Sequence, residues 1–201
     1  MGRMTDGYIV LDLETTGLDY KTEQITEIGA IKLDTEFKEI GRFHTMVSLE
    51  EGRKLPEFIT KLTGITTEDL VGKPSEQEAL KSLAEFIGDS KIVVAQNAPF
   101  DLSFISRGGI EPEYFACTRA LVRQIEPELS PSLKDVTARN GIVLNGHHRA
   151  LNDVEATIEV FKLYVHKEHQ VMYFNVVIDA PERPLTFIPK NARVVRITEA
   201  K

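Results

Sequence analysis

Apolar and polar residues alternate in short blocks over the first fifty positions of the chain. Residues 8–13 form an apolar run with one carboxylate inside it, and residues 24–33 and 39–49 consist mostly of residues that favour strands. Apolar runs of this length, bounded by turns, predict buried β-strands. Because residues 34–36 form a short polar connection between the second and third segments, we expect these two to pair as an antiparallel hairpin beside the first strand.

Helical spacing of apolar residues begins further along the chain. Pro56 and Gly64 are typical of the start and the end of a short helix, and Ser75 with Glu78 forms a capping box before a longer one. Beyond it, the pattern predicts strands near residues 91–95 and 113–117, and helices that begin near Pro99 or run through 120–125, 132–139 and 152–165. A meander of strands followed by alternating helices and strands predicts an α/β fold, in which a mixed β-sheet has helices on both faces.

Composition narrows the class of protein further. The 201 residues, 42% of them hydrophobic, suit one globular domain with its own core. A formal net charge of −7 argues against a protein that coats nucleic acid with a broad basic surface, but not against an enzyme that acts on a chain end. The single cysteine, Cys117, excludes an intramolecular disulfide and a zinc site built from cysteines. Since no apolar run could span a membrane and residues 1–6 do not resemble a signal peptide, we expect a cytoplasmic location.

Two carboxylates interrupt the end of the first predicted strand. Asp12 and Glu14 stand two residues apart, so both side chains point to the same face of the strand. Two ionised carboxylates at the end of a buried strand would repel each other and lose hydration, unless a cation lies between them. Hard divalent cations such as magnesium and manganese prefer such oxygen ligands. The alternative is that Asp12 only ends the strand and that Glu14 is solvated.

Two further acids and a histidine stand at positions that the fold could bring to the same place. Asp101 lies in the first turn of the helix after the next core strand, and Asp153 lies early in the last long helix. Strand ends and helix starts of this kind meet at one edge of a sheet, where four carboxylates could hold two metal ions. His148, five residues before Asp153, has a side chain suited to taking a proton from water near neutral pH. The alternatives are acids favoured by helix dipoles and a histidine on a surface loop.

Three segments occur in an order that resembles a known family. Residues 12–17, 97–101 and 148–153 are similar to the three motifs of the DEDD exonuclease superfamily, histidine subclass (DEDDh). Within it, they are most similar to epsilon proofreading subunits of bacterial DNA polymerase III and to the exonuclease domain of Gram-positive replicative polymerases. Residues 62–65 resemble a further family segment, and the likeness extends over about residues 7–166.

The resemblance implies an RNase H-like fold and metal-dependent removal of nucleoside monophosphates from the 3′ end of a nucleic acid. In that case Asp12, Glu14, Asp101 and Asp153 would hold two Mg²⁺ or Mn²⁺ ions, and His148 would deprotonate the attacking water. The residues expected to contact the substrate are Thr15, Leu18, Asn97 and Phe100. For Leu18 the alternative role is packing.

Three positions near the motifs need separate comment. Gln96 and Cys117 stand where relatives often have histidine and aspartate, although neither position holds a metal in the family pattern. His147 could replace its neighbour as the base. We prefer His148 because its spacing to Asp153 fits the motif.

The rest of the chain is expected to form a second unit. We predict an exonuclease domain at residues 1–166 and a C-terminal extension at 167–201, with short strands that pack on the domain or on a partner. Residues 170–174 have a limited similarity to peptides that bind a sliding clamp, although Tyr173 stands where leucine is usual. The alternative is a plain strand that packs on the domain or against the second copy in a homodimer.

Three functions remain open from the sequence. The first is a DNA exonuclease that acts on single-stranded or frayed 3′ ends, either proofreading beside a separate DNA polymerase chain or working in repair. The second has the same chemistry on RNA ends or short oligoribonucleotides. The third is a non-catalytic module that docks on a polymerase, and the complete set of acids argues against it.

Overall fold

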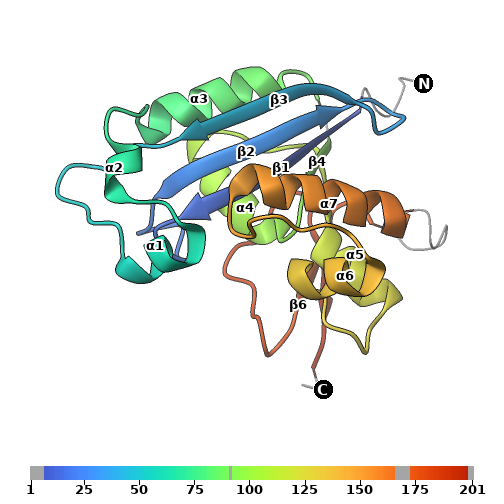
Figure 1. Ribbon diagram of the computed structural model, residues 1–201. Coiled ribbons are helices and arrows are strands. Elements are labelled where there is room, and N and C mark those ends of the chain that lie inside the picture. The colour runs from blue at the N-terminus through green and yellow to red at the C-terminus, as the bar shows by residue number, and fades with distance from the viewer. Residues whose placement is uncertain (1–6, 91, 166–172, 199–201) are drawn as a thin grey trace.

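The computed structural model describes residues 7–90, 92–165 and 173–198, and a five-stranded mixed sheet forms its centre (Figure 1). The strands lie in the order β3-β2-β1-β4-β5. Their bounds are Tyr8–Thr15 for β1, Ile25–Leu33 for β2, Glu39–Met46 for β3, Ile92–Ala95 for β4 and Tyr114–Cys117 for β5. The first three are antiparallel, which confirms the predicted hairpin, whereas β4 and β5 run parallel to β1.

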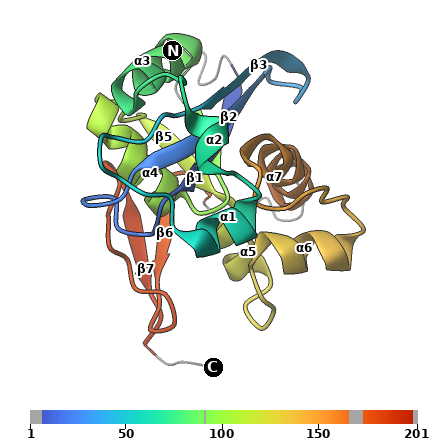
Figure 2. The ribbon, with the colours of Figure 1, turned by 60° about the vertical axis from the view of Figure 1, so that its left-hand side comes forward.

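Helices cover both faces of this sheet, as predicted (Figures 1 and 2). Apolar residues of α3 and α4 pack on one face, and those of α5, α6 and α7 pack on the other. The bounds are Glu57–Thr63 for α1, Thr67–Leu70 for α2, Glu76–Ile87 for α3, Ala98–Ile105 for α4, Ser106–Gly108 for the 3-10 turn η1, Thr118–Ile125 for α5, Leu133–Asn140 for α6 and Ala150–Val165 for α7. No helix in the described part of the chain has the length and apolarity needed to cross a membrane.

The two faces explain how β1 presents its carboxylates. Ile9 and Leu11 belong to the core under α3 and α4, while Val10 belongs to the core under α7. Because side chains alternate along a strand, Asp12 and Glu14 lie on the same side as Val10, toward α7.

Most helix ends follow the local signals of the sequence. The Ser75 hydroxyl accepts a hydrogen bond from the Glu78 N–H, and the Glu78 carboxylate accepts one from the Ser75 N–H, which completes the predicted capping box. Two features differ from the prediction. Helix α7 begins at Ala150, two residues before the predicted Asn152, and the short helix α2 was not predicted. A single turn such as α2 has too few residues to show a helical period, although Thr66 gives it a cap.

Residues 173–198 contain two further strands, β6 (Val176–Asp179) and β7 (Arg193–Arg196), which pair in parallel and are drawn in red in Figure 2. Asn175 attaches them to β5, because its side-chain oxygen accepts from the Phe115 N–H at 2.8 Å and its own N–H donates to the Phe115 carbonyl at 2.7 Å. The predicted boundary at residue 166 stays a prediction, since residues 166–172 lie outside the described part of the chain. The clamp-like segment 170–174 falls mostly among them.

Candidate active site

The carboxylates of Asp12, Glu14 and Asp153 converge between the sheet and α7. One ligand oxygen from each lies within 4.8 Å of the others. Glu14 and Asp153 are buried, and Asp12 is partly buried. Burial and the neighbouring carboxylates raise the pKa of Asp12 well above its ordinary value and that of Glu14 to about 8. These acids therefore lie together where water stabilises their ionised forms poorly.

Asp101 joins the cluster from the other side of the sheet. It lies in the first turn of α4, is 2% exposed, and raises the pKa of Asp12 more than any other charged neighbour does. Burial raises the pKa of Asp101 itself to about 8, while a hydrogen bond from the Leu13 N–H on β1 opposes this effect. The structure therefore brings the predicted acids together, with Asp101 close enough to Asp12 and Glu14 to raise their pKa values.

The donor set of this cluster fits divalent cations. All of its donors are carboxylate oxygens, which magnesium and manganese prefer. Without a bound cation, the ionised carboxylates would repel one another. Arg149 lowers the pKa of Glu14, but its guanidinium is already hydrogen-bonded to Glu27. Among the described residues, this guanidinium therefore pairs with Glu27 and not with the clustered acids.

Both histidines precede α7, on a loop that bends sharply. His148 has a positive φ of 68°, and its backbone N–H donates to Asp153 at 3.2 Å. The ring of His147, not that of His148, contacts Asp153, with Nδ1 2.9 Å from the carboxylate. The two rings stack with their centroids 3.8 Å apart. Burial and the charge of His147 lower the pKa of His148, so this ring is neutral near pH 7.

Glu27 on β2 also belongs to the site, although the sequence pattern did not single it out. It pairs with Glu14 across the β1–β2 ladder, and its side chain is 1% exposed. It accepts hydrogen bonds from the Arg149 guanidinium at 2.9 Å and from the Ala150 N–H at 3.0 Å, and lies 2.7 Å from His44 Nε2. Burial raises the pKa of Glu27, but these hydrogen bonds lower it by more, so that the pKa lies below its ordinary value. Glu27 thereby fixes the first residues of α7, one turn before Asp153.

Gly29, two residues further along β2, allows this close approach of α7. A Cβ at this position would lie 2.7 Å from the backbone nitrogen of Leu151 and 2.8 Å from the carbonyl carbon of Ala150. Any side chain here would push the helix away from the strand. A buried acid and a glycine in a mostly apolar strand were the signals that the sequence offered. The residues that they contact in α7 and just before it lie more than a hundred positions further along the chain.

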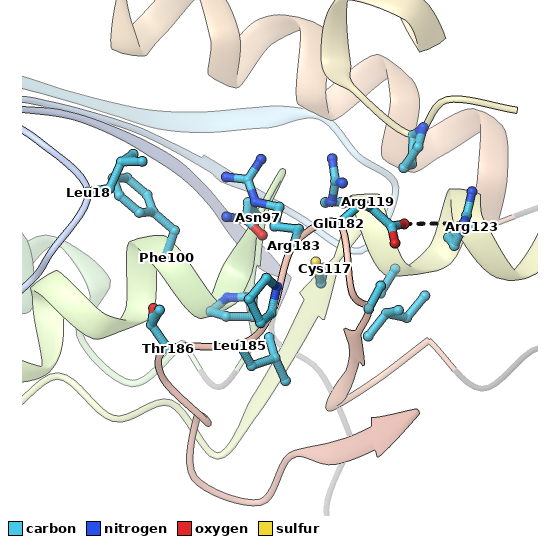
Figure 3. A pocket seen from close by; sticks show the side chains of 16 residues that line it. Leu18, Asn97, Phe100, Cys117, Arg119, Arg123, Glu182, Arg183, Leu185 and Thr186 are labelled. Carbon is cyan, nitrogen blue, oxygen red and sulfur yellow. Dashed lines mark hydrogen bonds and ion pairs between the residues drawn. The ribbon is translucent and has the colours of Figure 1, made fainter. Parts of the chain in front are cut away.

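Three of the four expected substrate-contacting residues line one cavity of about 570 Å³ (Figure 3). Leu18 is 77% exposed, and Asn97 and Phe100 come from the start of α4. Thr15 is different, because its buried hydroxyl donates to the Gly17 carbonyl at 2.6 Å and so shapes the turn after β1. Cys117 lines the same cavity as a buried thiol, and burial raises its pKa. Gln96 donates to the Pro131 carbonyl at 2.9 Å and accepts from the Thr118 hydroxyl.

Comparison with known proteins shows the family to which the chain belongs. A family model described as Exonuclease matches residues 9–161. DNA polymerase III subunit epsilon of Aquifex aeolicus is 37% identical over 170 residues, which cover 79% of this chain and 80% of that protein. DNA polymerase III PolC-type of Clostridium perfringens is 36% identical over 190 residues, which cover 91% of this chain but only 13% of the polymerase.

Solved structures share the same fold. Escherichia coli exonuclease I in complex with a dT13 oligonucleotide has a TM-score of 0.71 and 21% identity over 81% of this chain and 41% of that one. The nuclease domain of 3′hExo, a DEDDh family member bound to rAMP, has a TM-score of 0.70 and 16% identity over 85% and 96% of the two chains. Because the Exonuclease model matches residues 9–161, the chain belongs to the family that this model describes and is a 3′–5′ exonuclease.

Proposed function

We propose that this protein hydrolyses the terminal phosphodiester of DNA at single-stranded or frayed 3′ ends and releases nucleoside 5′-monophosphates. Its role would be proofreading with a DNA polymerase, or repair, in the cytoplasm. The observation that carries the proposal is the convergence of three carboxylates within 4.8 Å, with Asp101 beside them. The epsilon and PolC-type relatives support the link to replication.

The four acids would hold two divalent ions, Mg²⁺ or Mn²⁺. When bound, the two ions would supply the positive charge that stabilises the attacking and leaving oxygens of the phosphodiester. Asp12, whose pKa is raised most by Asp101 and Glu14 among its charged neighbours, would contribute to both ion sites. Burial of these carboxylates favours the cations further, because little water competes for the same oxygens.

His148 is the proposed general base. A lowered pKa keeps its imidazole neutral near pH 7, so a ring nitrogen can accept a proton from the attacking water. The direct contact between His147 and Asp153 gives the neighbouring ring a different task, which is to hold the Asp153 carboxylate in place. Separate substitutions of the two histidines distinguish these roles.

Leu18, Asn97 and Phe100 would bind the terminal nucleotide. Exposed Leu18 and the ring of Phe100 offer an apolar surface to a base or sugar, while the Asn97 amide can hydrogen-bond its polar edge. Exonuclease I and exonuclease X have been solved with single-stranded DNA and with 5′-overhanging duplex DNA, respectively. The second candidate, hydrolysis of RNA ends, is favoured by the rAMP bound to 3′hExo.

The test is digestion of a 5′-labelled single-stranded DNA oligomer and its RNA counterpart, with Mg²⁺ or Mn²⁺. We expect a ladder that shortens from the 3′ end, is abolished by EDTA, and forms faster on DNA. Faster digestion of RNA would select the second candidate. If the protein leaves both oligomers intact with either metal, the proposed activity is wrong and a polymerase-docking role replaces it.

A further inference from the structure

The cavity that holds Leu18 and Phe100 is also lined by residues of α5 and of the C-terminal extension (Figure 3). Three arginines line this part of it. Arg119 and Arg123 come from α5, and Arg183 comes from the loop after β6. Arg123 is neutralised by Glu182, to which its guanidinium lies at 3.3 Å. The excess positive charge of the cavity therefore belongs to the other two.

Arg119 and Arg183 lack a carboxylate partner among the described residues. Neither guanidinium forms an ion pair or a side-chain hydrogen bond with that part of the chain. Arg119 is partly buried, and burial together with the positive charge of Arg183 lowers its pKa. Arg183 is exposed, so the cost falls on the partly buried guanidinium of Arg119, which stands beside a like charge unless an anion binds both. This is notable in a chain with a net charge of −7, which has many carboxylates to offer.

We infer that Arg119 and Arg183 bind a backbone phosphate of the substrate strand, upstream of the phosphodiester that is cleaved. The inference rests on the proposed function, because it places the terminal nucleotide against Leu18 and Phe100 in the same cavity. Guanidinium groups match phosphate oxygens with paired hydrogen bonds. The cavity lined by both arginines is also lined by Asn97 and Phe100 at the start of α4, the helix whose first turn carries Asp101, so a strand that reaches the carboxylates passes these arginines.

Part of this phosphate contact would come from residues beyond those that the Exonuclease family model matches. That model ends at residue 161, whereas Arg183 lies in the extension that Asn175 attaches to β5. The extension would therefore lengthen the substrate site by about one phosphate. The same chemistry accepts an internal phosphodiester or the terminal 5′-phosphate of a short oligomer.

A length series tests the inference. The substrates are a thymidine dimer with a free 5′-hydroxyl, the same dimer with a 5′-phosphate, and longer thymidine oligomers with 5′-hydroxyls. For the wild type, we expect KM to fall when the first upstream phosphate is added, whether terminal or internal. In the single variant Arg183→Ala and in the double variant Arg119→Ala/Arg183→Ala, we expect the first upstream phosphate no longer to lower KM. Their KM for longer oligomers should rise roughly tenfold above that of the wild type. The slope of log KM against log salt should fall by about 0.7 for each phosphate contact removed.

Arg196→Ala is the matched control, because it removes an arginine from the same extension but outside the cavity, where its side chain is 78% exposed. Hydrolysis of the p-nitrophenyl ester of thymidine 5′-monophosphate, which has no upstream phosphate, normalises the rates. Suppose that the wild type cleaves this ester and that Arg183→Ala has the same KM as the wild type for every oligomer length. In that case the proposed phosphate contact is wrong and the proposed function stands. If the wild type cleaves neither the ester nor the oligomers, the proposed function itself is wrong.

Discussion

Arg149 and Glu27 form the link between the beginning of α7 and the second strand of the sheet, with Arg149 Nη2 2.9 Å from Glu27 Oε1. The carboxylate is almost fully buried, while the guanidinium is 41% exposed. Glu27 is therefore held inside the sheet, whereas the side chain of Arg149 is open to solvent. Because the same carboxylate also accepts from the Ala150 N–H, it positions the helix that carries Asp153.

Replacing Glu27 by Ala should disturb both stability and catalysis. The change leaves the Ala150 N–H and Arg149 without their acceptor, which we expect to lower the free energy of unfolding by about 1–3 kcal/mol in urea denaturation. Displacement of Asp153 should lower the exonuclease rate roughly 10–100-fold and raise the metal concentration needed for half-maximal activity.

Glu39→Ala is the control for this substitution, because Glu39 pairs with Arg42 at an exposed position. It should change the free energy of unfolding by about 0.5 kcal/mol or less and leave the metal requirement unaltered. A Glu27→Ala protein with the wild-type metal requirement would show that Glu27 does not position the acids.

The metal-free protein should lose stability as the pH rises. The pKa values of Glu14 and Asp101 are raised to about 8, so in the folded state these groups hold protons that the unfolded chain has already released. Their contribution to stability is complete at low pH and is lost as the pH passes through about 8. In EDTA we expect the melting temperature to fall by roughly 5 °C or more between pH 6.5 and 8.5.

This range of pH lies above the ordinary pKa of histidine, so the lowered pKa of His148 does not obscure the carboxylates. Added Mg²⁺ or Mn²⁺ should flatten the curve, since the ions favour the ionised acids. A melting temperature that stays constant or rises with pH in EDTA would contradict the raised pKa values.

The two histidines should respond differently to substitution. His148→Ala removes the proposed proton acceptor and should lower kcat by about 10²–10⁴-fold with little change in KM for DNA. His147→Ala removes the contact with Asp153 and should act mainly on metal affinity, with a loss of about tenfold. Kinetic measurements over a range of metal concentrations separate the two effects. Saturating metal that restores His148→Ala but not His147→Ala would reverse the assignment.

Leu18 offers a direct test of the nucleotide site. Its side chain is 77% exposed, so Leu18→Ala should fold normally, yet it should raise KM for DNA by about fivefold or more through lost contact with the terminal base. Val143→Ala removes a similarly exposed apolar side chain, which lies outside the cavity, and should leave KM unchanged. Equal KM values for the two variants would leave Leu18 without a role in substrate binding.

The sequence predicted those parts of the site that depend on local structure. Asp12 and Glu14 share a face because side chains alternate along a strand, and Asp101 and Asp153 follow from the helix starts. Glu27 escaped prediction because its partner Arg149 lies 122 residues away, and only the packing of α7 on Gly29 brings them together. Two further features of the site, the contact of His147 with Asp153 and the position of Arg183, also depend on tertiary structure.

The contact between His147 and Asp153 depends on the left-handed backbone of His148, for which the sequence pattern gives no signal. Likewise, Arg183 reaches the cavity only because Asn175 attaches the extension to β5. Its position 82 residues after Asp101 carries no periodic pattern that could have placed it there.

Manganese binding by the wild type and by Asp12→Asn, measured by calorimetry beside the exonuclease rate, tests the metal centre most directly. Asparagine keeps the shape of the side chain and removes its charge, so circular dichroism should show an unchanged fold. We predict two Mn²⁺ ions per wild-type chain, weaker binding in the variant, and a rate at least about 10³-fold lower. A variant that digests DNA at the wild-type rate, or a wild type that remains active in EDTA, would contradict the assignment of these carboxylates as a catalytic metal site.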